Sequence, residues 1–356
     1  MYSESDIDAA VTAGAIDAAS AARLRDFVAA NRAAPAVDEE SFRLVTGFND
    51  IFVTIAATLL LVAVGWIGGE IRAPFAGFAV AAVAWGLAEY FTRARRMALP
   101  SILLLLAFAG GLFAGAMALF VDGRGIGAMA GGVEDGRVRA LALGLVTAGA
   151  IAAGGTRLHW RRFRVPITIA TGAGAAVALA MGVILSALPA AAEHVRSLTF
   201  LAGLIVFALA MRWDMSDPER TTRRSDVAFW LHLLAAPMIV HPVFTGLGLL
   251  GRDATSGAAG IVLLLYVALG CMALAIDRRA LMVSALVYVL FAVSAVFRQF
   301  SVVGLNVAFT ALVIGSALLL LSAFWQVARA FVVGLLPPGI AKRLPPVRKL
   351  IPRPAS

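Results

Sequence analysis

The sequence predicts an all-α protein, a polytopic bundle of about ten transmembrane helices with both termini in the cytoplasm. The chain of 356 residues is 61% hydrophobic and 14% charged, whereas soluble domains have about 45–50% apolar and about 25% charged residues. Its mean hydropathy is +0.90, and apolar stretches long enough to cross a hydrocarbon core about 30 Å thick recur along it. A single soluble globular domain is therefore excluded.

Ten apolar stretches approach or reach the length of a membrane span, about 17–25 residues. They are Ile51–Ile67, Ala73–Phe91, Leu99–Val121, Val138–Gly155, Val165–Leu188, Leu198–Met211, Val227–Leu250, Ala258–Ile276, Ala280–Phe297 and Val303–Trp325. The sixth is short, and only Arg298–Val302 separates the ninth from the tenth. Ten spans are therefore the preferred count, and nine is the alternative.

The basic residues predict which side of the membrane each loop faces. With ten spans and a cytoplasmic N-terminus, 23 of the 30 Lys and Arg residues fall in cytoplasmic segments and seven in outer ones. Cytoplasmic loops carry the excess of basic residues in membrane proteins, so both termini are predicted to be cytoplasmic. The net charge of +9 then reports orientation, and no nucleic-acid partner is expected.

Residues 1–32 precede the first span and predict a short cytoplasmic helical hairpin. Gly14 is expected to end the first helix and Asp17 to cap the second. Residues 33–50, with Pro35 and an acidic run, predict a linker and interfacial segment before the transmembrane domain of residues 51–325. The start of the chain is acidic, whereas a secretory signal peptide begins with basic residues. The first span is therefore expected to act as an uncleaved anchor.

Residues 326–356 form a basic, proline-rich segment that is predicted to be an extended cytoplasmic tail. Proline pairs at Pro337-Pro338 and Pro345-Pro346 alternate with Lys and Arg. A basic residue near an anionic lipid surface contributes about 1 kcal/mol to binding. The expected partners are therefore the lipid bilayer and its anionic headgroups, and a proline-motif ligand for a protein partner is the alternative.

Several classes of chemistry find no support in the sequence. The single cysteine, Cys271, excludes a disulfide framework and a zinc or iron–sulfur site built from cysteines. Gly125-Ile126-Gly127-Ala128-Met129-Ala130 matches a dinucleotide-binding pattern, but it lies in an outer loop with no preceding strand. No Walker loop, Gly-x-Ser-x-Gly elbow or His-Glu-x-x-His pair is present, so no cofactor and no enzymatic activity are expected.

Polar residues in or near the spans are the candidates for function, because an ionisable group at the bilayer centre costs about 2.5–3.5 kcal/mol on insertion scales. The candidate intramembrane polar pathway consists of Asp50, Glu89, His232, His241, Arg298 and Asn306. Asp50 and Glu89 are either membrane anchors that pair with neighbouring arginines or pathway residues. The seventh span, with its preceding loop, holds the densest group of polar residues.

His232 and His241 both lie in this seventh span, where Pro237 and Pro242 predict a kink. A separation of nine residues places the two rings on opposite faces of a helix and about 13.5 Å apart along it, so no shared metal ion is expected. A haem would need an axial ligand from another predicted span, and none of those contains a histidine. His232 is either a proton-relaying group or a neutral histidine bonded to a backbone carbonyl.

Two patterns concern helix packing and repetition. Small residues recur every four positions at Ala170, Gly174, Ala178, Gly182 and Ser186, and again at Gly111 and Gly115. Such stripes let helix backbones approach closely in lipid, so a compact bundle is predicted. Arg-Arg pairs precede the third, fifth, seventh and ninth spans, which indicates either an ancestral duplication or the ordinary placement of cytoplasmic arginines.

The start of the chain also carries a resemblance. Gly14-Ala15-Ile16 and Ala22-Arg23-Leu24, followed by Phe42-Arg43-Leu44 and Gly47-Phe48-Asn49-Asp50-Ile51-Phe52, lead into the first span. This arrangement resembles uncharacterised multi-pass inner-membrane proteins of bacteria, domain-of-unknown-function families that place a short helical segment before many spans. The resemblance implies the bacterial cytoplasmic (inner) membrane and implies no catalytic residue.

Two hypotheses for function follow from these observations. The first is a transporter-like protein for a small solute or ion. The second is a non-catalytic membrane scaffold or sensor that recruits cytoplasmic partners through the N-terminal hairpin and the basic tail. An enzyme acting on lipids ranks third, because no acid/base pair or nucleophile is visible in the sequence.

Overall fold

A computed structural model describes residues 7, 10–24, 48–121, 133–217, 220, 222–246, 256–279, 282, 286, 289–290, 306–341 and 344–345. Most of these residues are helical, and none of them is in a strand. The chain divides into two compact units, Met1–Leu44 and Val45–Ser356. The all-helical class predicted from the sequence is confirmed.

The N-terminal unit contains the predicted helix break and cap. Gly14 has a φ of 69°, a left-handed conformation that glycine adopts without steric penalty. Asp17 Oδ1 accepts a hydrogen bond of 2.5 Å from the amide of Ser20, and Oδ2 accepts one of 3.1 Å from the Ser20 hydroxyl. These bonds hold the pKa of the Asp17 carboxyl below its usual value. Both local predictions, at Gly14 and at Asp17, are confirmed.

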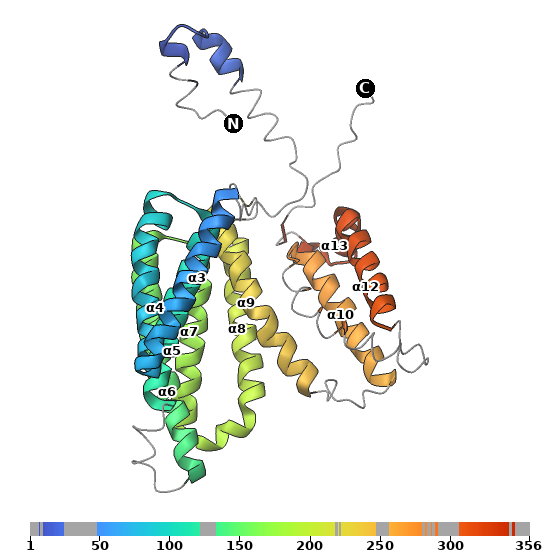
Figure 1. Ribbon diagram of the computed structural model, residues 1–356. Helices are drawn as coiled ribbons and strands as arrows, with labels where there is room; N and C mark the ends of the chain where they lie inside the picture. The colour runs from blue at the N-terminus through green and yellow to red at the C-terminus, as the bar shows by residue number, and fades with distance from the viewer. Residues whose placement is uncertain are drawn as a thin grey trace. The chain divides into compact units, whose positions relative to one another are not determined.

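The second unit begins with long apolar helices (Figure 1). They are α3 (Phe48–Ile71), α4 (Ala73–Ala88) continued by the π-helix η1 (Glu89–Ala94), α5 (Ala98–Val121), α6 (Val133–Phe163), α7 (Ile167–Ala187), the 3₁₀ turn η2 (Pro189–His194) followed by α8 (Val195–Met215), and α9 (Arg223–Gly246). Within the described part of the chain, seven helices are long and apolar enough to cross a membrane. They coincide with the first seven predicted spans.

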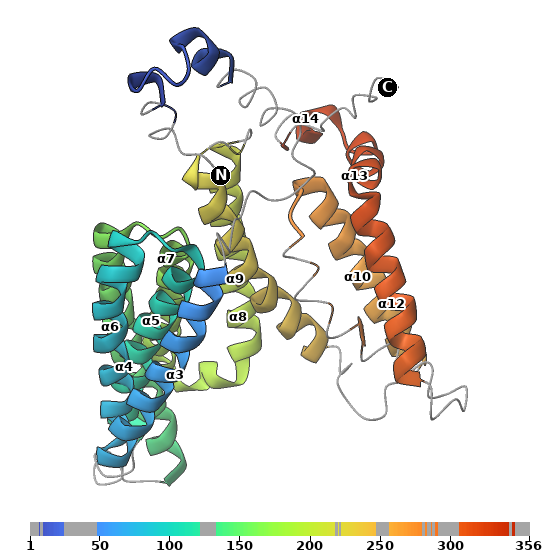
Figure 2. The ribbon, with the colours of Figure 1, turned by 45° about the horizontal axis from the view of Figure 1, so that its top comes forward.

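The remaining helices are α10 (Ser256–Ile276), α12 (Asn306–Ala323), α13 (Trp325–Gly334) and α14 (Pro338–Ala341) (Figure 2). The last predicted span, Val303–Trp325, ends in a bend of 76° between residues 311–323 and 325–334, and this bent pair would make an eighth membrane-crossing element. The predicted ninth span, Ala280–Phe297, lies almost entirely outside the described residues. The tail predicted to be extended from residue 326 instead starts as helix α13.

Helix α6 differs most from its predicted span. The sequence predicted Val138–Gly155, whereas α6 runs over 31 residues to Phe163. The hydropathy drops at Arg157, Arg161 and Arg162, but these residues have good helix propensity, so the helix continues past the apolar stretch. His159 is therefore inside a membrane-crossing helix and fully buried. The expectation that only the seventh span contains histidines is wrong.

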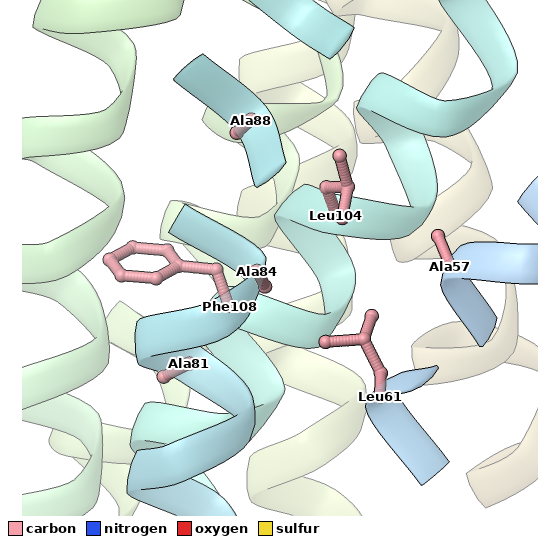
Figure 3. Packing of buried hydrophobic residues seen from close by; sticks show 7 residues of the cluster. All are labelled: Ala57, Leu61, Ala81, Ala84, Ala88, Leu104 and Phe108. Carbon is pink, nitrogen blue, oxygen red and sulfur yellow. The ribbon is translucent and has the colours of Figure 1, made fainter. Parts of the chain in front are cut away.

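Buried side chains in the first half of the bundle are mostly small. Ala57 and Leu61 of α3 meet Ala81, Ala84 and Ala88 of α4 together with Leu104 and Phe108 of α5 (Figure 3). Many large apolar side chains instead face outward, among them Leu59 and Trp66, which are 67% and 73% exposed. Such apolar faces are unfavourable in water and suitable for lipid contact.

Helices α4 and α5 pack closely against each other through glycines. A Cβ placed on Gly77 would overlap the backbone nitrogen of Gly115 and would lie 2.5 Å from the carbonyl oxygen of Gly111. Gly182 of α7 lies similarly close to α6, because a Cβ placed on it would be 2.6 Å from the backbone nitrogen of Val146. Close packing at Gly111, Gly115 and Gly182 confirms that these predicted small residues allow helix backbones to meet.

Candidate functional site

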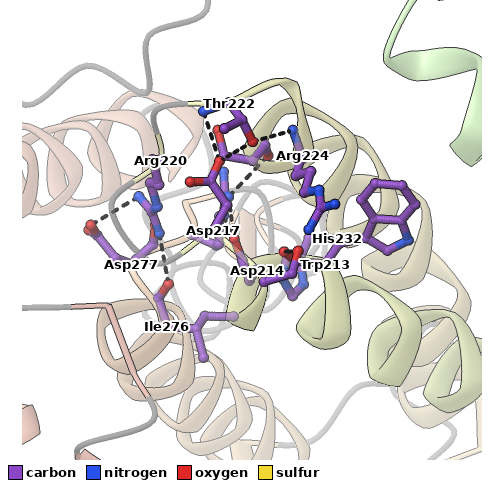
Figure 4. Close-up of polar contacts among 12 residues, drawn as sticks. Trp213, Asp214, Asp217, Arg220, Thr222, Arg224, His232, Ile276 and Asp277 are labelled. Atoms are coloured by element: carbon purple, nitrogen blue, oxygen red, sulfur yellow. Dashed lines mark hydrogen bonds and ion pairs between the residues drawn. The ribbon is translucent and has the colours of Figure 1, made fainter.

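A buried polar cluster joins three helices at one end of the second unit. His232 Nε2 of α9 lies 2.9 Å from Asp214 Oδ2 of α8. Arg278, which follows α10, donates through Nε to the same Oδ2 at 3.2 Å and through a terminal nitrogen to Asp214 Oδ1. The exposed fractions of the three side chains are 4% for Asp214, 0% for His232 and 2% for Arg278. We call these residues the Asp214 cluster, of which Figure 4 labels Asp214 and His232.

The end of α10 turns Arg278 into this position. Asp277 has a φ of 57°, and the amide of Arg278 donates to the carbonyl of Ala273 at 2.8 Å. This is the left-handed helix ending of a Schellman motif, which usually has glycine at the position of Asp277. Arg278 also donates to the carbonyl of Ser225 in α9 at 3.1 Å, so one side chain connects the ends of three helices.

His232 lies in the most buried of the seven membrane-crossing helices. Half of the residues in the apolar segment of α9 are buried, whereas the buried share is at most 39% in each of the other six helices. The ring packs edge-on against Phe207 of α8, with centroids 5.3 Å apart. A carboxylate only accepts hydrogen bonds, so Nε2 of His232 is the nitrogen that donates to Asp214. The other ring nitrogen, Nδ1, is buried and has no hydrogen-bond partner among the described residues.

A second set of contacts surrounds Asp277, whose carboxylate joins the loop before α9 to helix α13. Arg220 lies 3.1 Å from Asp277 Oδ2 and also donates to the carbonyls of Ile276 and Asp277. Trp325 Nε1 donates to Asp277 Oδ1 at 2.7 Å, and Arg329 Nε lies 3.7 Å from the same oxygen. Arg220 has a φ of 56°, a conformation that a non-glycine residue holds only when its surroundings impose it.

The loop between α8 and α9 is closed by one further carboxylate. Asp217 Oδ2 accepts hydrogen bonds from the amide and the hydroxyl of Thr222, at 2.9 Å and 2.7 Å. The ion pairs of this region thus join Asp214 to Arg278, and Asp277 to Arg220 and Arg329.

The structure brings few of the predicted site residues together. His232 is in the Asp214 cluster, while His241, nine residues further along α9, has an exposed side chain. Asp50 is 4% exposed in the first turn of α3. Glu89 is on the surface, where its carboxylate pairs with Arg162 at 2.8 Å and with Arg93 at 3.2 Å.

The other predicted positions concern prolines and the last spans. Pro237 and Pro242 both lie inside α9, which stays a single helix through them. Arg298 lies outside the described residues, and Asn306 begins α12 with its side chain outside them as well.

Sequence reasoning missed Asp214, Arg278, Asp277 and Arg329 as partners. Asp214 belonged to the polar segment noticed before the seventh span, but its partner Arg278 is 64 residues away. The signal that could have pointed to these four residues is a charged side chain at or near the end of a helix. His159 was missed because its predicted span ended at Gly155. Its Nδ1 lies 3.3 Å from the Thr168 hydroxyl, and the ring contacts Phe163.

Nothing in the described part of the chain forms a group of three or more His, Cys, Asp or Glu side chains that could hold a metal ion. The arrangement at Asp214 instead has the chemistry of a proton-binding and charge-pairing site. Comparisons of the sequence with family models and with curated proteins, and of the fold with solved structures, found no match.

Proposed function

We propose that the chain is a proton-linked transporter of a small solute or ion, and that the Asp214 cluster is the site where proton binding is linked to helix movement. One observation carries this proposal. The fully buried His232 donates a hydrogen bond through Nε2 to Asp214, and its other ring nitrogen, Nδ1, has no hydrogen-bond partner among the described residues. Ionisable groups inside membrane helices are expensive and commonly mark proton relays.

The chemistry of the cluster suggests how a proton would act. Neutral His232 carries its hydrogen on Nε2, so an incoming proton binds at Nδ1. The charged groups facing the ring are Asp214 from α8, Arg278 after α10 and Arg220 from the loop before α9. Protonation adds one positive charge, and the imidazolium then competes with Arg278 for Asp214. Because Arg278 ties the end of α10 to α8 and α9, a weaker contact there frees α10 to move.

Helix α9 has a second property that suits movement. Pro237 and Pro242 have no amide hydrogen, so the carbonyls of Leu233 and Met238, four residues earlier, lose their ordinary intrahelical partners. Helix α9 continues as one helix through both prolines, and the freed carbonyls are acceptors that a solute or ion can contact, as backbone carbonyls do in many transporters. The proposal places the solute pathway beside the part of α9 between His232 and Pro242.

For the membrane arrangement, we propose ten spans with both termini cytoplasmic in the inner membrane of a bacterium. The count of 23 basic residues on one side and seven on the other supports this topology. In it, the Asp214 cluster lies at the cytoplasmic ends of the helices.

The test is proton movement in liposomes that contain the purified protein and a pH-sensitive dye. A mixture of amino acids, sugars and inorganic ions is added outside, and acidification of the lumen is followed. We expect solute-dependent acidification with the unmodified protein and its loss in His232→Gln. The control is His194→Gln, which changes the same residue type at an exposed position in η2, away from the proposed pathway. Equal acidification in both variants, with both folded, would refute the proposal.

A second candidate is a scaffold or sensor that recruits cytoplasmic partners. The observation that favours it is the separation of residues Met1–Leu44 as a compact unit of their own. In a strain lacking the gene, complementation separates the two functions. A transporter requires His232 and tolerates deletion of residues 1–44, whereas a scaffold requires residues 1–44 and tolerates His232→Gln.

A further inference from the structure

A second fully buried histidine, His159 of α6, takes no part in the Asp214 cluster. Its Nδ1 lies 3.3 Å from the hydroxyl oxygen of Thr168, near the start of α7. Its Nε2 is buried and has no hydrogen-bond partner among the described residues. Whichever of His159 and Thr168 supplies the hydrogen between them, Nε2 stays unpaired. Buried polar atoms are nearly always paired in native structures, so this exception requires an explanation.

Three aromatic rings from three helices surround the imidazole. The centroids of Trp85 from α4, Phe108 from α5 and Phe163 from α6 lie 6.0, 5.8 and 4.5 Å from the centroid of His159. Phe108 and Phe163 also contact Trp85, each with a centroid distance of 5.1 Å. We call His159 and these three aromatic residues the His159 box.

The helices that form the His159 box are in direct contact beside it. A Cβ placed on Gly155, one turn before His159 on α6, would overlap a methyl group of Leu112 in α5 and would lie 3.4 Å from the Phe108 ring. The His159 side chain itself has an exposed fraction of 0%. Water therefore reaches the imidazole only if this end of α6 moves away from its neighbours.

The box holds no charge that could balance a proton on the imidazole. The three packed helices α4, α5 and α7 contain no charged residue. The charged residues on η1, which continues α4, and on the last two turns of α6 are Glu89, Arg93, Arg157, Arg161 and Arg162. Glu89 is the carboxylate among them, and it is already paired with Arg162 and Arg93 on the surface.

This environment makes the packing of α6 sensitive to acid. An imidazolium inside the box would have neither water nor a carboxylate beside it, and burying a charge without compensation is strongly unfavourable. In water, histidine takes up a proton below about pH 6.5. The closed form of the box is thus favoured above this pH. As the pH falls, the open form gains, because it binds one more proton than the closed form.

We infer that His159 is an acid-sensing, proton-binding site, and that uptake of a proton separates the end of α6 from α4 and α5. The inference does not depend on the proposed transport activity, which rests on His232 and on contacts of α8, α9 and α10. It explains why a polar ring with an unpaired nitrogen is held in an aromatic box.

Hydrogen exchange of the full-length protein in detergent, read by mass spectrometry, tests this site. Exchange times are scaled to the intrinsic amide rate at each pH. Uptake of one proton on opening changes the open population by up to about tenfold per pH unit. We therefore expect the protection of residues 152–163 to fall roughly tenfold between about pH 6.5 and about pH 5.

Variants assign this fall to one side chain. His159→Phe keeps the box aromatic without a group that titrates and should abolish the fall, and His159→Gln serves the same purpose if His159→Phe fails to fold. The control His194→Gln, at an exposed position in η2, should keep it. His232→Gln should keep it too, because His232 contacts other helices. A fall that is absent from the unmodified protein, persists without His159 or disappears in His232→Gln would overturn the inference.

Discussion

At the scale of single residues, Asp214 shows how the environment decides the role of a side chain. Its carboxylate accepts from His232 and Arg278 at an exposed fraction of 4%, whereas Glu89 pairs with Arg162 and Arg93 on the surface. Surface ion pairs contribute little to stability, because water and salt screen them. Removing one partner from a buried pair is more damaging, because the other charge is left buried without compensation.

We therefore expect Asp214→Asn to lower the free energy of unfolding by about 3–5 kcal/mol. Glu89→Gln should lower it far less, since water screens both of its ion pairs. The measurement is denaturant-induced unfolding in mixed micelles. Replacing the whole cluster by apolar residues, in Asp214→Leu/His232→Leu/Arg278→Met, should restore much of the stability lost in Asp214→Asn. A triple variant less stable than Asp214→Asn would show that the cluster itself stabilises the fold.

Asp17 provides a pH-dependent prediction in the N-terminal unit. The hydrogen bond from the Ser20 amide holds the pKa of the Asp17 carboxyl below its ordinary value of 3.8, so the folded form binds its proton less readily than the unfolded form. The stabilisation is complete above the unfolded pKa and is lost as the pH falls through the lower folded pKa.

Circular dichroism of a peptide spanning residues 1–44 checks this expectation. Helicity should decrease as the pH is lowered from 6 to about 2. In Asp17→Asn, whose amide caps a helix without titrating, the decrease should be smaller because only the other carboxylates contribute. Identical pH profiles for the two peptides would contradict a capping role for Asp17.

At the scale of helices, packing depends on where glycine is placed and less on how often it occurs. Gly77 meets the backbone of α5 at Gly111 and Gly115, whereas a Cβ added to Gly86 in the same helix would meet no atom within 4 Å. Gly174 belongs to the predicted stripe of small residues on α7. A Cβ added to it would have only the Leu234 side chain within 4 Å, at 3.8 Å. Equal spacing along a helix therefore does not make every small residue a contact point.

Gly77→Ala should destabilise the protein by about 1–3 kcal/mol, because the added methyl group forces α4 and α5 apart. Gly86→Ala should be neutral or stabilising by up to about 1 kcal/mol, since alanine favours the helix and meets nothing. Thermal unfolding in the same detergent compares them. A Gly77→Ala variant as stable as Gly86→Ala would show that the two helices separate easily.

At the scale of the whole molecule, the proposed topology assigns each helix end to one side of the membrane. Arg161, near the end of α6, belongs to the cytoplasmic side, and Ala190, in the turn η2 between α7 and α8, belongs to the outer side. Both have exposed side chains. The single native cysteine, Cys271, makes a cysteine-free background available through one substitution.

In a Cys271→Ser background, Ala190→Cys should react with a membrane-impermeant maleimide added to intact spheroplasts. Arg161→Cys should react only after the membrane is permeabilised. The reverse pattern would place the termini outside, and labelling of both positions in intact spheroplasts would rule out an odd number of crossings between them.

The sequence by itself determined the helical class, the first seven membrane-crossing helices and the local features at Gly14 and Asp17. Each of these depends on hydrophobic length or on contacts between residues close in the chain. Only the tertiary structure decided which polar residues meet. Asp214 and Arg278 are 64 residues apart, and their pairing depends on how α8, α9 and α10 pack. The end of α6 also lay beyond hydropathy, because arginines continue a helix that apolar residues began. The bend of 76° after α12 lay beyond it too, since apolar residues continue on both sides of the bend.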